Sequence, residues 1–275
     1  SGIHFKHSLF FLKRGSHVLI EKPFVLKLNH AKKLINISKE KNLKCWTSLQ
    51  NRYNLATTKL KLEIKSKSIG KISLVDCNML WHRNKKYYSN NWRGKYVSDG
   101  GVLTNQAIHL LDTLIYNFGQ ISKFDVFAGF NKKKLQAEDL IIINFKHKNG
   151  IFSSFKATTR ANNNYHSAID VVGDKGRIIV KGVSLNTFSK FKKHDLILYK
   201  KFSENFDENL GAAGGMGFGH KKILNEFLNY KKKSSKHLEI EYNYYLLKLI
   251  HSLYNNISVR KHFNIVLDKQ SVLGK

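Results

Sequence analysis

Residues 17–24, HVLIEKPF, combine a continuously apolar run with a charged pair and the only proline of the chain. Such a run is typical of a strand buried in a parallel sheet, where both faces of the sheet are covered. Amphipathic helical patterns flank it over residues 1–15 and 28–42, and a second strand pattern follows over residues 44–54. Two alternating helix–strand units predict half of a doubly wound α/β sheet in residues 1–54.

The pattern changes after residue 54 to that of an α+β unit. A helical pattern over residues 55–70 leads to a strand pattern over 71–81, a long polar loop and a helical pattern over 102–118. This part therefore opens with one strand between two helices.

Short strands then follow one another from about residue 121 to 202, with hairpin signals at HKNG (147–150) and GDKG (173–176). Helical patterns at about 220–232 and 241–257 close the chain. The sequence predicts an open, mostly antiparallel sheet flanked by helices, and we expect the last helix to pack back on the first unit.

The net charge of +29 raises the question of nucleic-acid binding. Only 7 of the 48 basic residues are arginine, the preferred residue for bidentate contacts with phosphates and bases. The lysines are spread along the whole chain, and the abundance of Lys, Asn, Ile, Phe and Tyr also fits an AT-rich coding sequence. The composition argues against specific nucleic-acid binding and fits an anionic small substrate equally well.

The two cysteines, Cys45 and Cys77, lie far apart and lack the spacing of metal ligands. This usage is typical of a reducing compartment and predicts neither a disulfide nor a metal site. No apolar run approaches the roughly 20 residues that a membrane-spanning helix needs. We therefore expect a cytoplasmic protein that binds neither metal nor membrane.

A polar stripe crosses the segment DGGVLTNQAIHLLD (99–112). On a helix Asn105, His109 and Asp112 fall at i, i+4 and i+7 and share one face. This face is either a solvated surface or the wall of a pocket, in which Asn105 orients a ligand and His109 transfers a proton. The glycines at 100 and 101 would let the preceding backbone approach another group closely.

Lys22 lies at the end of the first strand pattern, directly before Pro23. Proline restricts the preceding residue to an extended conformation, which fixes the direction in which Lys22 leaves the strand. Because ligands bind at the carboxyl ends of strands in such sheets, Lys22 is a candidate for polarising a substrate hydroxyl. Taken alone, it is better interpreted as one surface lysine among many.

The pair HVLIEKPF and GG…NQAIHLLD resembles the Gfo/Idh/MocA family of NAD(P)-dependent sugar and polyol oxidoreductases. The resemblance covers essentially the whole chain, including LQNRYN (49–54) and GHKKILNEFLN (219–229). Residues 87–112 look closest to members that act on nucleotide-linked amino sugar uronates in surface-polysaccharide synthesis. The resemblance implies NAD(P)-dependent oxidation of a sugar hydroxyl to a ketone.

The family pattern implies a role for each matching residue. Lys22 would hydrogen-bond the hydroxyl near the nicotinamide ribose, and His109 would act as general base. Many members carry Asp at the position of Asn105, so the substitution puts the pH dependence in doubt. The expected cofactor-binding residues are Glu21, Lys22, Pro23, Gln50, Arg52, Trp92 and Arg93. The expected substrate-binding residues are Lys22, Arg52, Tyr88, Asn105, His109 and His220.

Some of these roles have a simpler alternative. A Trp92–Arg93 pair suits a nicotinamide or a diphosphate, yet a loop tryptophan can equally pack on its own domain. His220 follows a glycine run at the start of a helix, where free backbone N–H groups favour an anionic substrate group. The run GGMGFG (214–219) is not a dinucleotide fingerprint, because no buried strand precedes it.

The resemblance implies that residues 1–54 are the C-terminal part of a Rossmann-type dinucleotide-binding domain. Residues 55–275 would be an α+β substrate and oligomerisation domain, forming homo-oligomers through the open sheet face. In this family the glycine-rich turn and the acidic ribose reader lie within roughly the 80 residues that precede the position of Ser1, so we expect a truncated chain that is inactive alone. The alternatives are a non-catalytic binding or assembly protein that has lost the cofactor half, and a basic nucleic-acid binder.

Overall fold

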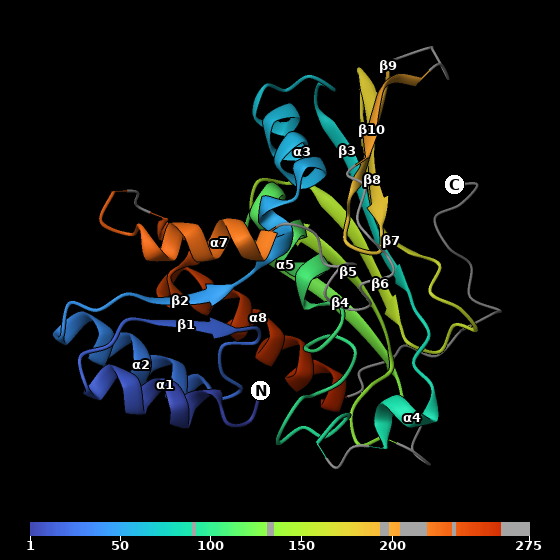
Figure 1. Cartoon of the computed structure of the whole chain (residues 1–275). Helices are drawn as coiled ribbons and strands as arrows, with labels where there is room; N and C mark the ends of the chain where they lie inside the picture. The colour runs from blue at the N-terminus through green and yellow to red at the C-terminus, as the bar shows by residue number, and fades with distance from the viewer. Residues whose placement is uncertain (90–91, 131–134, 193–197, 204–218, 233–234, 260–275) are drawn as a thin grey trace.

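The computed structural model of the chain describes residues 1–89, 92–130, 135–192, 198–203, 219–232 and 235–259 (Figure 1). Its strands form two sheets, a two-stranded sheet near the N-terminus and an eight-stranded sheet that occupies the rest of the molecule. This arrangement confirms the predicted α/β unit followed by a sheet domain with flanking helices.

The small sheet pairs β1 (Val18–Glu21) with β2 (Cys45–Ser48) in parallel. The helices α1 (His4–Lys13) and α2 (Leu28–Glu40) share a core with one face of the strand pair, and α7 (Gly219–Leu228) packs on the other face (Figure 1). Both faces are thus covered, as the continuously apolar strand patterns predict.

The large sheet has the strand order β10-β9-β8-β7-β3-β6-β5-β4. Its strands are β3 (Ile72–Leu80), β4 (Ile121–Gly129), β5 (Leu140–His147), β6 (Phe152–Thr158), β7 (His166–Gly173), β8 (Gly176–Gly182), β9 (Thr187–Lys192) and β10 (Leu198–Ser203). Neighbours are antiparallel except β3 and β6, and the predicted turns at 147–150 and 173–176 join β5 to β6 and β7 to β8. The first strand of this sheet along the chain therefore lies in its middle.

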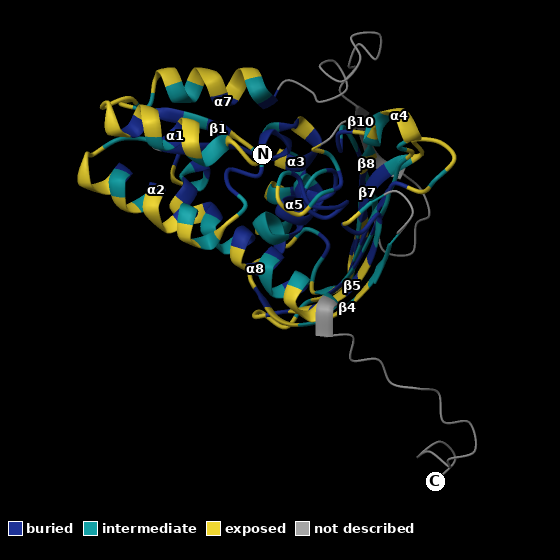
Figure 2. Ribbon diagram, turned by 90° about the horizontal axis from the view of Figure 1, so that it is seen from below, coloured by how far each residue is buried: buried dark blue, intermediate teal, exposed yellow. Residues whose placement is uncertain are grey.

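One face of the large sheet is covered by helices. The core between them contains side chains of α3 (Leu55–Lys65), α5 (Ile108–Phe118) and α8 (Ile240–Val259). The other face carries exposed apolar side chains, among them Leu74, Phe127, Ile142, Phe152 and Val172. Figure 2 shows exposed positions along the strands of this sheet. Association of copies through this face stays a prediction.

The helix expected over residues 102–118 begins only at Ile108. Glu138 holds the preceding turns, because its backbone carbonyl accepts from the Val102 N–H and its carboxylate from the Leu103 N–H. Gly100, at φ +72°, supports the sharp approach to this segment. Asn105 therefore belongs to a turn and not to the helix of His109.

Two other boundaries differ from the expectation. The residues after β2 form the 3-10 helix η1 (Gln50–Tyr53) instead of continuing the strand, and α7 ends at Leu228 instead of Lys232. Residues 211–218 of the glycine run before α7 lie outside the described residues. The remaining elements are α4 (Lys85–Tyr88) and η3 (Lys236–Leu238).

The described part of the chain contains neither a candidate membrane span nor a candidate metal cluster. No helix there is long and apolar enough to cross a bilayer. No group of three or more His, Cys, Asp or Glu side chains within it could hold a metal ion. Cys45 and Cys77 are both buried and form no disulfide.

Candidate active site

A cavity of about 300 Å³ lies where the end of β1, η1 and the start of α5 meet one end of the central strands β3 and β7 of the large sheet. It brings together segments that are more than 100 residues apart in the sequence, from Lys22 to Leu185. Its polar lining residues are Lys22, Gln50, Asn51, Arg83, Tyr87, Arg93, Asn105, Gln106, His109, Ser167 and Ser184.

Lys22 enters this cavity from the carboxyl end of β1. Its Nζ donates a hydrogen bond of 2.5 Å to the backbone carbonyl of Asn105. Burial lowers the pKa of Lys22, while the carboxylates of Glu21 and Asp99 oppose that shift. The ammonium group thus has one protein acceptor and further N–H donors for a ligand.

His109 lies in the first turn of α5 and lines the same cavity. Its Nε2 is 3.3 Å from the Gln50 amide nitrogen, which can donate only if this ring nitrogen is unprotonated. Burial, followed by the charges of Lys22, His220 and Arg52, lowers the pKa of His109 well below its usual value. The imidazole is therefore neutral at pH 7, the state that a general base requires.

Asn105 is fixed by both hydrogens of its amide group. Nδ2 donates to the Asp99 carboxylate at 2.6 Å and to the Tyr87 hydroxyl at 3.2 Å. Its Oδ1 has no partner among the described residues and is left to accept from a ligand. Burial raises the pKa of Asp99, against the opposing effects of Asn105 and Lys22.

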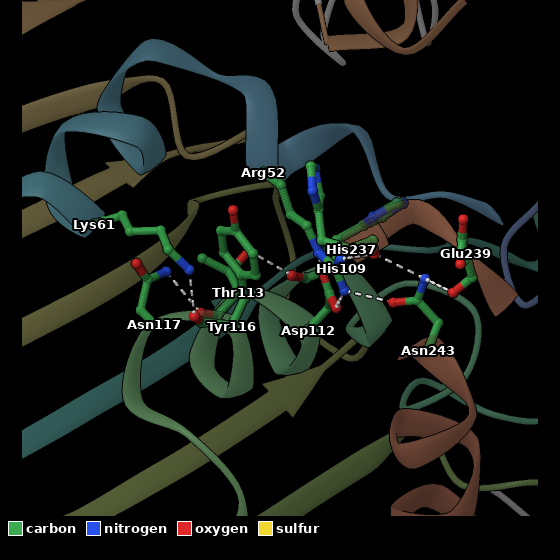
Figure 3. Close-up of polar contacts among 10 residues, drawn as sticks. All are labelled: Arg52, Lys61, His109, Asp112, Thr113, Tyr116, Asn117, His237, Glu239 and Asn243. Carbon is green, nitrogen blue, oxygen red and sulfur yellow. Dashed lines mark hydrogen bonds and ion pairs between the residues drawn. The ribbon is translucent and has the colours of Figure 1, made fainter. Parts of the chain in front are cut away.

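The interpretation of Asn105, His109 and Asp112 as a solvated stripe is wrong. Asp112 is only 3% exposed and forms a two-point ion pair with Arg52. Arg52 also donates to the His237 carbonyl at 2.5 Å and to Asn243 Oδ1 at 2.7 Å (Figure 3). This buried network joins η1, α5, η3 and α8 directly behind the cavity.

The network corrects the expectation that Arg52 binds cofactor or substrate. Its guanidinium is engaged by protein acceptors, and Arg52 does not line the cavity. Tyr88 also points elsewhere, because its hydroxyl bonds to Thr159 Oγ1 at 2.9 Å, whereas the neighbouring Tyr87 lines the cavity. Burial raises the pKa of Tyr88 to about 12.

The other expected residues surround the cavity to different degrees. Arg93 lines it, but Trp92 does not and is 43% exposed. Glu21 is exposed beside His220, with 3.6 Å between carboxylate and ring nitrogen, and neither lines the cavity. Pro23 lines a separate, largely apolar cavity of about 760 Å³ against α8.

Sequence reasoning missed Arg83, Asp99, Gln106, Ser167 and Ser184. Asp99 and Gln106 lie inside the quoted motif, but their importance depends on the turns that replace the expected helix. Ser167 and Ser184 come from β7 and the β8–β9 turn, which carry no local signal. The rarity of arginine in this lysine-rich chain was the one sequence feature that could have identified Arg83 as a candidate site residue.

Comparison with known families assigns both parts of the chain. Residues 1–49 match the NAD-binding Rossmann fold of the oxidoreductase family, and residues 57–179 match the GFO/IDH/MocA C-terminal domain. The chain belongs to the Gfo/Idh/MocA family. The cofactor of this family is NAD, which residues 1–49 match through the NAD-binding Rossmann fold.

Individual relatives are distant. An uncharacterised oxidoreductase of Synechocystis is 20% identical over 68% of this chain, which spans 54% of that protein. The D-glucoside 3-dehydrogenase of Escherichia coli is 24% identical over 42% of this chain, which spans 33% of it. The WlbA dehydrogenase of Chromobacterium violaceum, solved with NADH and UDP-GlcNAcA, has a TM-score of 0.80 at 24% identity over 98% of this chain and 76% of its own. At this identity the structural likeness establishes the fold.

Proposed function

We propose that this chain carries the substrate site and the nicotinamide end of an enzyme that oxidises a sugar hydroxyl to a ketone with NAD or NADP. The observation that carries the proposal is the meeting of Lys22 Nζ, the neutral His109 ring and the free Asn105 Oδ1 around one cavity. An acid–base pair of this kind, with an acceptor for a neighbouring hydroxyl, suits alcohol oxidation. The dehydrogenases of a glucoside and of scyllo-inositol among the relatives support a sugar substrate.

The residues present fit the nicotinamide end of such a cofactor. β1 and β2 are parallel and end at the cavity, the position at which dinucleotides bind in doubly wound sheets. Gln50 Oε1, His109 Nδ1 and Arg93 Nε are buried there without a partner among the described residues. Lys22 and Gln50 would hold the group, which when bound accepts a hydride from the alcohol carbon.

His109 supplies the base. Its low pKa keeps the ring neutral, so Nε2 can take the hydroxyl proton after the Gln50 N–H withdraws. Rotation of the Gln50 amide would then present Oε1, which has no partner in the described part of the chain, to the new Nε2–H. Gln50 therefore serves both protonation states of the base.

Lys22 stabilises the negative charge that develops on the substrate oxygen as the proton leaves. Its hydrogen bond to the Asn105 carbonyl keeps the ammonium at the cavity edge. Asn105 Oδ1 would accept from an adjacent hydroxyl, and Asp99 and Tyr87 keep the amide from turning its N–H groups toward that hydroxyl. We propose a nucleotide sugar as substrate, which the UDP-GlcNAcA complexes of two structural neighbours support.

The test is reduction of NAD⁺ and NADP⁺, followed at 340 nm, by the intact protein as its cells make it, with a panel of UDP-sugars. We expect His109→Ala and Lys22→Ala to lower kcat by roughly 10²- to 10⁴-fold with an unchanged melting temperature. His7→Ala and Lys32→Ala, both at exposed sites on α1 and α2, are matched controls. Turnover near wild type in either cavity variant would refute the mechanism, and no turnover by the intact protein would favour a binding or assembly role.

A further inference from the structure

Five arginines of the described residues differ in whether an acid pairs with them. Three have aspartate partners in the ion pairs Arg52–Asp112, Arg160–Asp139 and Arg177–Asp170. Arg83 and Arg93 form no ion pair with any acid in the described residues, and both line the candidate active site. Two unpaired guanidinium groups thus face one cavity.

Protein contacts hold each guanidinium by one nitrogen. Arg83 Nη1 donates to the His82 carbonyl at 2.6 Å and to Asn164 Oδ1 at 3.0 Å. Arg93 Nη1 donates to the Tyr87 carbonyl at 3.2 Å. These bonds orient the planar groups and leave Nε and Nη2 of both arginines without an acceptor in the described part of the chain.

The Tyr87 ring holds the two groups together. The guanidinium carbon of Arg93 lies 4.1 Å from the ring centroid and that of Arg83 lies 5.3 Å from it. Arg93 Nε is also buried, so its missing acceptor costs free energy that a ligand would recover. The two guanidinium groups therefore lie against one ring with N–H donors available for an anion.

The charge of the cavity lining points the same way. Lys22 adds a third cation to the two arginines, and no Asp or Glu of the described residues lines the cavity. The exposed lysines elsewhere contribute little, because about 0.15 M salt screens charges beyond roughly 8 Å. The field inside the cavity therefore favours a negatively charged ligand.

We propose that Arg83 and Arg93 bind an oxyanion of the substrate, either a carboxylate on the sugar ring or a phosphate of the nucleotide. Guanidinium groups bind both through paired N–H···O bonds, which lysine cannot reproduce. The inference rests on the proposed function, since the sugar would extend from this anion site to Lys22 and His109. It makes an uncharged sugar a poor substrate.

Calorimetric titration of the intact protein at 0.15 M salt, without added cofactor, tests the proposal. UDP-glucuronate, UDP-glucose and glucose differ stepwise by a carboxylate and by the nucleotide diphosphate. We expect Arg83→Gln and Arg93→Gln to weaken binding of the recognised anion by roughly ten- to hundred-fold. Arg14→Gln is the matched control for net charge, because Arg14 lies exposed on the surface against Phe10.

The pattern of losses identifies the anion. A loss confined to UDP-glucuronate assigns the ring carboxylate, and an equal loss for both UDP-sugars assigns the diphosphate. Unchanged affinity in folded Arg83→Gln and Arg93→Gln, or glucose binding as tightly as the UDP-sugars, would overturn the proposal. Arginine-dependent binding without any NAD(P)⁺ reduction would instead contradict the proposed function and leave the anion site standing.

Discussion

Asp112 and Arg52 form a buried two-point ion pair one helical turn beyond His109. The pair connects the helix that carries His109 to the segment that carries Gln50, its hydrogen-bond partner. Figure 3 shows Arg52 between Asp112 and Asn243, so α8 is held at the same point. The geometry of the proposed base is thus set by groups that do not reach the cavity.

Asp112→Ala leaves the Arg52 charge buried and unpaired. We expect it to lower the free energy of unfolding by about 3–5 kcal/mol, measured by urea denaturation. Arg52→Met/Asp112→Leu removes both charges and should regain most of that loss. A double variant as unstable as Asp112→Ala would show that the network stabilises the fold through more than charge pairing.

Glu138 gives the protein a defined pH dependence of stability. Burial raises its pKa to about 7, against hydrogen bonds from the Leu103 N–H and the Tyr254 hydroxyl. Because the unfolded chain releases this proton near its ordinary pKa of 4.5, stability falls as pH rises from 4.5 to 7. We expect Glu138→Gln to remove this loss. It amounts to about 3 kcal/mol, because a shift of one pKa unit corresponds to about 1.4 kcal/mol. Parallel stability–pH curves for wild type and Glu138→Gln would contradict this account.

His109 shifts stability in the opposite direction. Its folded pKa lies well below 6.5, so the unfolded chain binds the proton first as the pH falls. Stability is therefore lost below pH 6.5, and His109→Gln should flatten that part of the curve. The same pKa should place the acidic limb of kcat/KM below pH 6.5. An NMR titration of the His109 ring with a midpoint above 6.5 would be inconsistent with the site described above.

The hydrogen-bonded pair of Asp99 and Asn105 can be tested by exchanging the carboxylate and the amide between the two positions. Asn105→Asp places a second carboxylate against Asp99, where 2.6 Å now separates a hydrogen-bonded pair. Because both groups cannot ionise at this distance, we expect lower stability at pH 7 that recovers in acid. Asp99→Asn/Asn105→Asp restores one carboxylate and one amide, and its melting temperature should return toward wild type. A single variant as stable as wild type at pH 7 would argue against the buried contact.

Local patterns predicted the small sheet and the hairpins. The continuous apolar run around Ile20 identifies a strand covered on both faces, and GDKG fits the turn between β7 and β8. Such features depend on residues close in the sequence, where turn chemistry and side-chain periodicity act. The family resemblance also singled out Lys22, Asn105 and His109, which line one cavity, and their roles there stay predictions.

Contacts between residues far apart in the sequence determine the features of the site that the sequence did not predict. Arg52 and Arg93 are both arginines near an expected cleft, yet Asp112 engages the first and no described acid engages the second. The start of α5 depends on Glu138, more than 25 residues further along the chain. Periodicity contains no information about such partners.

The central position of β3 affects how the chain must be made. Its two neighbours, β6 and β7, are completed only when the ribosome reaches Gly173, about 100 residues after Ile72. At roughly 5–20 residues per second, one edge of β3 waits about 4 to 16 seconds for β6, and the other waits about 5 to 20 seconds for β7. Nascent chains stalled before residue 152 should therefore expose an apolar strand to chaperones, and the sheet closes late in synthesis.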